Sequence, residues 1–174
     1  MNKESVKEFL IEEISRDRLD RLNESDEIDG ELFVSLLWEI MISNTHPYAW
    51  RAAWTMFHYV EKRKELSRKY LTEIIELLPH FKHNGQKREM MKVLLLFPMK
   101  ELDFEKLIDI CFNILINPKE NIAVRVHAMQ IIFNIGDIEP DIRLELKIVL
   151  EDGIQNNESK GFVGRAKKLL KKMA

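Results

Sequence analysis

The residues best suited to chemistry gather in one short segment. Trp50, Trp54 and His58 are spaced by four, with Arg51 beside the first of them. Residues four apart lie on the same side of an α-helix, so the three rings should form one stripe. Tryptophan and arginine are favoured in binding interfaces because they combine a large contact area with polar groups. This stripe is a candidate for recognition of a ligand, although the same spacing is more often that of a packed core, and both interpretations stay open.

Arginine recurs along the chain at a nearly constant interval. Arg51, Arg88, Arg125 and Arg165 are separated by 37, 37 and 40 residues, and periods in this range are typical of helical repeats. A guanidinium can bond carbonyls and carboxylates between repeats, or it can face outward and bind anions. For Arg125, which has Asn117 and Asn121 nearby, we favour the internal role. Arg51 is less clear, because its segment is rich in aromatic residues.

No segment of the sequence matches a known catalytic pattern. It contains no phosphate-binding P-loop, no Gly-rich dinucleotide fingerprint and no Gly-x-Ser-x-Gly nucleophile turn. His80 and His83 could form half of a metal site, but two histidines lack the further ligands that zinc needs. We therefore expect neither catalytic nor metal-binding nor cofactor-binding residues.

Composition favours a folded all-helical protein. The chain has 174 residues, of which 45% are hydrophobic, and only six Gly and five Pro, few for the tight turns of an all-β fold. The single cysteine, Cys111, lies in an apolar run and is expected to be a buried small hydrophobe. The longest apolar run, Val93 to Phe97, is far shorter than the roughly twenty residues that span a bilayer. With no signal-peptide pattern at Met1 to Ser5, we expect a cytoplasmic protein that has no membrane partner.

Charge is distributed unevenly. The net charge of −2 gives no global reason to bind nucleic acid or an anionic membrane. Residues 1–31 nevertheless hold eleven acids and five bases, whereas residues 160–172 hold six bases and no acid. We interpret the basic segment as the polar outer face of an end repeat, with its last lysines near the carbonyl end of a helix.

Apolar periodicity, with Pro, Asn and Gly at the breaks, predicts a series of helices. An amphipathic helix is expected over about Glu4 to Ser15, followed by an acidic loop over Asn23 to Gly30. Beyond it, eight helices should pair as four hairpins, over Glu31 to Ser43, Pro47 to Lys62, Glu65 to Leu78, Gln86 to Phe97, Phe104 to Ile116, Ile122 to Ile135, Asp141 to Glu151 and Lys160 to Lys172.

The third hairpin closely resembles a HEAT repeat, in which the first helix ends in Asp or Asn and the second begins Val-Arg-x-x-Ala. Asn117, Val124, Arg125 and Ala128 occupy these positions. The first hairpin is similar, with Asn44 at the end of one helix and Trp50 in the place of Val. The other two hairpins match less well, since Lys87 and Gly164 precede their arginines.

The resemblance covers about Gly30 to Ala174 and implies an all-α, right-handed α-α superhelix, or solenoid, of about four HEAT-like hairpins behind an N-terminal capping helix. We expect residues 1–29 to form that cap and its acidic loop. The repeats should occupy about 30–63, 64–98, 101–136 and 138–174 within one domain. In this family the second helices commonly line a concave surface, which gives a predicted binding surface of Trp50, Arg51, Trp54, His58, Arg88, Lys92 and Arg125.

The leading hypothesis is a non-catalytic scaffold or adaptor that binds a protein or peptide on this surface. The alternative is nucleic-acid binding, since the alkyl-base DNA glycosylases built from HEAT-like repeats use tryptophan, arginine and an acid on their concave helices. Trp50-Arg51-Ala52-Ala53-Trp54 is loosely similar to such a segment, but no matching acid stands out nearby. A third possibility is self-association through Trp50, Trp54 and His58. The sequence leaves the oligomeric state and the partner open.

Overall fold

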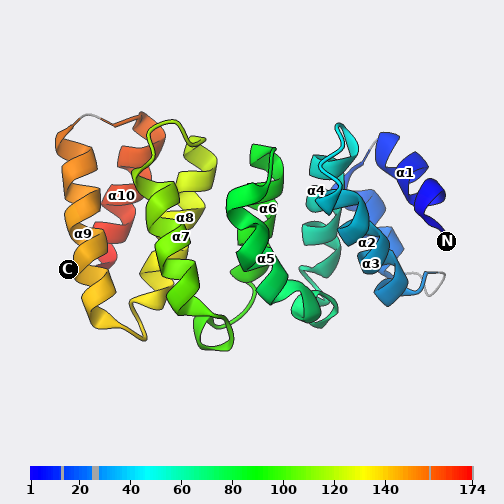
Figure 1. The fold of residues 1–174 in the computed structure, drawn as a ribbon, viewed down its shortest axis with the longest axis horizontal. Helices are drawn as coiled ribbons and strands as arrows, with labels where there is room; N and C mark the ends of the chain where they lie inside the picture. Colours follow the sequence, from blue (N-terminus) through cyan, green and yellow to red (C-terminus); the bar gives the residue numbers. More distant parts are fainter. Residues whose placement is uncertain (13, 25–27, 157, 174) are drawn as a thin grey trace. The chain divides into compact units, whose positions relative to one another are not determined.

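A computed structural model describes residues 1–12, 14–24, 28–156 and 158–173. These residues form helices joined by short turns and contain no strand (Figure 1). They fall into two compact units, residues 1–96 (unit 1) and residues 97–174 (unit 2). Unit 1 contains α1 (Lys3–Ile11), α2 (Arg16–Glu24), α3 (Gly30–Ile42), α4 (Tyr48–Val60), the 3-10 helix η1 (Lys64–Tyr70), α5 (Leu71–Leu77), η2 (Leu78–His80) and α6 (Asn84–Leu94). Unit 2 contains η3 (Met99–Glu101), α7 (Phe104–Ile116), α8 (Ile122–Ile135), α9 (Pro140–Gln155) and α10 (Lys160–Met173).

The predicted hairpins are confirmed as packed pairs. α3 packs on α4, α5 on α6, α7 on α8 and α9 on α10. The helices α7 and α8 have the predicted bounds because both have an effective N-cap: Asp103 accepts from the Lys106 amide and Asn121 accepts from the Ala123 amide. The division of the chain into four repeats of one domain stays a prediction.

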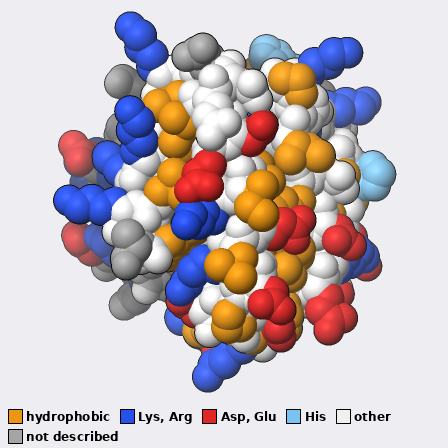
Figure 2. All heavy atoms as spheres, turned by 90° about the vertical axis from the view of Figure 1, so that its left-hand side faces the viewer, with side chains coloured by type: hydrophobic (Ala, Val, Ile, Leu, Met, Phe, Trp, Pro, Cys, Tyr) orange, Lys and Arg blue, Asp and Glu red, His pale blue; other side chains and the backbone are white. Residues whose placement is uncertain are grey.

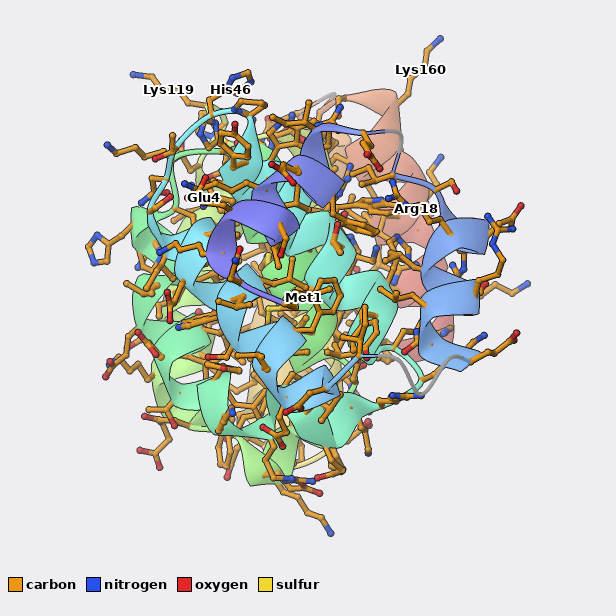
Figure 3. All side chains as sticks on the ribbon, turned by 90° about the vertical axis from the view of Figure 1, so that its right-hand side faces the viewer. Met1, Glu4, Arg18, His46, Lys119 and Lys160 are labelled. Carbon is orange, nitrogen blue, oxygen red and sulfur yellow. The ribbon has the colours of Figure 1, made fainter. Side chains whose placement is uncertain are left out.

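The N-terminal segment differs from the expected single helix. α1 ends at Ile11 and a second helix, α2, begins at Arg16, and Figure 3 shows Glu4 on the first and Arg18 on the second. The hydroxyl of Ser15 accepts from the Arg18 amide, so Ser15 begins a new helix instead of ending the old one. Residue 13 and residues 25–27 of the predicted acidic loop lie outside the described residues.

The start of the fourth predicted helix also differs. Residues Lys64–Tyr70 form a 3-10 helix, and α-helix begins only at Leu71. Within the 3-10 segment the buried Ser67 hydroxyl donates to the Lys64 carbonyl. Such local side-chain bonds satisfy backbone groups without an α-helix, which explains why apolar periodicity alone predicts the wrong helix type here.

Helix α4 is at the centre of unit 1. It contacts α1, α2, α3, α6 and η1, and eight of its thirteen residues are buried. Three of these are alanines, Ala49, Ala52 and Ala53, whose small side chains allow neighbouring helices to approach closely. The aromatic rings of Phe33 and Tyr59 meet edge to face beside them, with 5.0 Å between centroids.

Unit 2 is held together by α8, which contacts α7, α9 and α10. Its Arg125 is 5% exposed and donates from Nε to the Leu115 carbonyl. The same guanidinium makes two bonds to the Glu158 carboxylate, at 2.8 and 3.1 Å, and this pairing lowers the pKa of Glu158. Arg125 therefore ties the end of α7 to the turn before α10, which is the internal role expected from its position.

Cys111 is fully buried in α7, and burial raises the pKa of its thiol. Its predicted role as a small core hydrophobe is confirmed. Other apolar residues of the helices, such as Leu37, Ile74 and Leu107, are buried as well, whereas Leu36 and Ile108 are partly exposed.

Two glycines of unit 2 provide a matched test of this packing. A Cβ added at Gly153 would lie 2.3 Å from the Phe162 ring, whereas a Cβ at Gly164 would meet nothing within 4 Å. We expect Gly153→Ala to lower the free energy of unfolding by about 1–3 kcal/mol through overpacking. Gly164→Ala should raise it by up to about 1 kcal/mol, because alanine favours helix. Urea unfolding of both variants would measure the difference, and equal effects would contradict the described α9–α10 packing.

Candidate functional site

The best candidate site lies where α4 packs on α6 in unit 1. It consists of Trp54, Phe57 and His58 on α4 together with Glu89 and Lys92 on α6, and we call it the α4–α6 cluster. The Trp54 and His58 rings lie 4.3 Å apart between centroids, and those of Phe57 and His58 lie 4.9 Å apart. The spacing of four along α4 therefore brings Trp54 and His58 together as predicted.

Glu89 is a buried acid at this site. Its side chain is 1% exposed, and its two oxygens have different partners. Oε1 accepts from Arg88 at 2.9 Å and Oε2 accepts from Lys92 at 2.7 Å. An isolated carboxylate would be costly to bury, so these two cations are what allow the charge to remain here.

Lys92 also contacts the aromatic part of the site. Its Nζ lies 3.7 Å from the centroid of the Phe57 ring, within the range of a cation–π interaction. The lysine side chain is 25% exposed. The ring and Glu89 thus hold the ammonium in place, while the lysine side chain stays partly exposed.

The surroundings of His58 disfavour the charged form of its imidazole. Its side chain is 11% exposed, and burial, followed by the charge of Lys92, lowers the pKa of the imidazole below 6.5. Nδ1 has no hydrogen-bond partner among the described residues, and the nearest carboxylate oxygen, on Glu61, is 3.8 Å away. Glu61 pairs instead with Arg16 of α2. A buried ring nitrogen without a partner is an unused donor or acceptor at this site.

The remaining predicted residues of α4 and α6 have diverse contacts. Arg88 is adjacent to the cluster and its side chain is 43% exposed. Trp50 is partly exposed and lies against Gly85, where an added Cβ would be 3.2 Å from its own Cβ. Arg51 stacks near the Trp50 ring, but its Nη1 donates to the carbonyls of the α1 C-terminus, at 2.5 Å for Leu10 and 3.1 Å for Glu12.

Arg51 thus caps α1. No basic residue lies in the last turn of α1, so Arg51 supplies the positive charge that the carbonyl end of that helix lacks. Arg125 belongs to unit 2 and is buried by its bonds to Leu115 and Glu158. Both guanidiniums bond groups outside the α4–α6 cluster, so neither Arg51 nor Arg125 belongs to that cluster. The shared concave surface of all seven residues stays a prediction.

Glu89 is the residue of this site that the sequence patterns do not single out. A glutamate between an arginine and two methionines resembles an ordinary surface charge. The available signal was its position, because Glu89 lies three residues before Lys92 and four before the apolar Val93 on a helix. Only the packing of α4 against α6 shows that this charge is buried.

The described His, Cys, Asp and Glu residues do not form a group of three that could hold a metal ion. His83 lies near His46, with 5.7 Å between ring centroids, and His80 is exposed. In the described parts of the chain, every helix is too short or too polar to span a lipid bilayer.

The lowered pKa of His58 predicts a pH dependence of stability. As the pH falls below about 6.5, the unfolded chain takes up this proton before the folded chain does, so the free energy of unfolding should fall. Urea unfolding at pH 7.5 and pH 5.5 should show a smaller loss for His58→Gln than for the parent protein. The exposed His80→Gln variant serves as the control and should keep the parent behaviour. An unchanged loss in His58→Gln would contradict the burial of this imidazole.

The sequence of the chain matches a known family of helical repeats. A family model described as the HEAT repeat domain matches residues 6–173, nearly the whole chain. The comparisons with curated proteins and with solved structures found no match. The match agrees with the all-α composition of the described residues and with the hairpin pairs, and it includes the two N-terminal helices. The chain belongs to the HEAT repeat family and has an all-α fold of the solenoid class.

Proposed function

We propose that this protein is a non-catalytic interaction module whose α4–α6 cluster binds an acidic peptide segment of a partner protein. HEAT repeats commonly act as protein-interaction scaffolds and are generally non-catalytic. The observation that carries the proposal is the pairing of one buried acid with two partly exposed cations beside a partly exposed tryptophan.

The charges of the cluster favour an acidic partner. Arg88 and Lys92 are both held by Glu89, and their side chains remain 43% and 25% exposed. The single carboxylate balances only one of the two positive charges. Because the buried acid fixes both cations in place, a carboxylate from a partner would meet them at a small cost in side-chain entropy.

The aromatic part of the cluster favours a peptide over a lone anion. Trp54 is partly exposed and stacks on His58, so it offers an apolar surface within reach of the cations. An acidic side chain next to an apolar one, as in a helical or extended peptide, would satisfy both features.

A capture experiment with two matched variants tests this proposal. Trp54→Ala combined with Arg88→Ser removes one aromatic and one cation from the cluster. Phe112→Ala combined with Lys119→Ser likewise removes one aromatic and one cation, but from unit 2, where Phe112 is partly exposed and Lys119 is exposed. Proteins recovered by the parent should bind the first variant at least about tenfold more weakly and the second variant normally.

Binding of the recovered proteins should be measured by titration, after circular dichroism has shown that both variants are folded. A competing poly-glutamate peptide should reduce recovery by the parent. If the folded Trp54/Arg88 variant binds every recovered protein as the parent does, the proposed surface is wrong.

Nucleic-acid binding is retained as a second candidate because of one observation. The sequence shows no acid to accompany Trp54, whereas the structure places the buried Glu89 on the helix that packs against it. An acid beside tryptophan and cationic residues is the combination that the DNA glycosylases with HEAT-like repeats use. Against this candidate, both oxygens of Glu89 are already bonded to cations, and the net charge of the chain is −2.

The two candidates differ in their dependence on salt. A protein that neutralises phosphates binds DNA much more weakly as salt rises. Fluorescence anisotropy with single-stranded and duplex DNA should show no binding at about 50 mM salt if the peptide proposal is right. Binding at that salt, reduced by Arg88→Ser and Lys92→Ser, would instead favour the nucleic-acid candidate.

A further inference from the structure

The helix α9 has apolar residues on two opposite sides. Leu146 and Leu150 are fully buried against the rest of unit 2. Leu144 and Ile148 are 62% and 67% exposed, the highest values among the exposed large hydrophobic residues described. These two residues are one helical turn apart and, at 100° per residue, point away from Leu146. A helix with apolar residues on two opposite sides usually packs against neighbours on both of them. In this structure α9 packs on one side only.

Acidic residues lie along one edge of this exposed stripe. Asp141, Glu145 and Asp152 follow the same flank of α9 and are exposed. None of the three pairs with a cation among the described residues. On the other flank of α9, Arg143 and Lys147 line a cavity of about 290 Å³ together with Met173 of α10, so this flank is the one nearest the C-terminal end of α10.

Basic residues lie on the α10 side of the same face. Lys167, Lys168 and Lys171 are exposed on α10, and none has a carboxylate partner among the described residues. Figure 2 looks onto this face: hydrophobic side chains run through its middle with some charged side chains among them, and acidic side chains gather toward the lower right. Many of the Lys and Arg side chains lie toward the left. The exposed apolar residues of α9 therefore lie between an acidic flank and the lysines of α10, and on the flank nearer α10 the exposed Glu151 pairs with Lys147.

We propose that this face binds a second copy of the same face. A two-fold axis parallel to α9 and α10 would turn the second copy so that its lysine edge lies over the acidic edge of the first. The acidic edge of the second copy would meet the lysines of the first in the same way. A two-fold axis perpendicular to the helices would instead bring like charges together, so the charge pattern selects one arrangement.

The arrangement also accounts for the apolar stripe. Each α9 would lie antiparallel to α10 of the second copy, giving four helices around Leu144 and Ile148 of both copies. The hydrocarbon stems of Lys167 and Lys171 of the second copy would cover these residues while their ammonium groups reach the carboxylates. The helix dipoles of antiparallel neighbours are also favourable. Since the face belongs to unit 2, this proposal does not depend on the α4–α6 cluster.

Reversing the charges on one edge of the face at a time tests the proposed dimer directly. One variant, Glu145→Lys with Asp152→Lys, makes both edges basic. The other, Lys167→Glu with Lys171→Glu, makes both edges acidic. In the proposed dimer each variant alone would place like charges opposite one another, whereas a mixture of the two would place opposite charges on both edges.

Sedimentation velocity at about 50 mM salt should show a dimer for the parent protein, and about 500 mM salt should weaken it. Each charge variant alone should raise the dimer dissociation constant by at least about tenfold, and an equimolar mixture should recover a dimer containing both. Leu144→Ser with Ile148→Ser should also dissociate the dimer. Leu32→Ser, which changes a 42% exposed leucine of unit 1, is the control and should not.

Two results would overturn the proposal. One is a parent protein that stays monomeric at about 100 µM and low salt. The other is a dimer that persists in both charge variants, since its contact would then lie elsewhere, for example at Trp54. Circular dichroism of each variant separates loss of the dimer from loss of the fold.

Discussion

The packing of unit 1 depends on one helix, α4, which is buried on most of its sides. α4 is apolar on several sides, so no single neighbour can cover it, and α1, α2, α3 and α6 each shield a part of it. Transfer of these side chains from water is the main stabilising contribution, which the ordering of the backbone largely offsets. The position of each neighbouring helix follows from the part of α4 that it covers. The partly exposed Trp54 and His58 lie where this cover is incomplete.

The fold was largely predictable from the sequence because its signals are local. Asp103 and Asn121 define the starts of α7 and α8, and apolar periodicity gives the pairing of hairpins. The errors have local causes as well. The Ser15 hydroxyl begins a second helix where periodicity predicts a continuous one, and Ser67 stabilises a 3-10 segment that apolar spacing cannot distinguish from an α-helix. Both are single side-chain bonds that a pattern of apolar residues does not contain.

The candidate site was less predictable, since it depends on contacts between helices. The arginine period indicated the architecture correctly, but the four arginines do not share one role. Arg51 caps α1, Arg88 pairs with Glu89, Arg125 joins Leu115 to Glu158, and Arg165 bonds Gln130. The spacing of the arginines therefore identifies the repeat. The partner of each guanidinium depends instead on which carbonyl, carboxylate or amide groups the neighbouring helices place within its reach. Glu89 could not be recognised from the sequence as a buried acid for the same reason, because its burial depends on how α6 packs against α4.

The bonds of Arg51 make the first helix part of the framework of unit 1. One guanidinium nitrogen bonds the carbonyls of Leu10, Ile11 and Glu12, and thus joins the end of α1 to the first turn of the central helix α4. A shortened protein that begins after Glu12 would expose the apolar surface of α4 and leave this half-buried cation without its acceptors. The boundary of a minimal folding unit is therefore determined by a contact made about forty residues further along the chain.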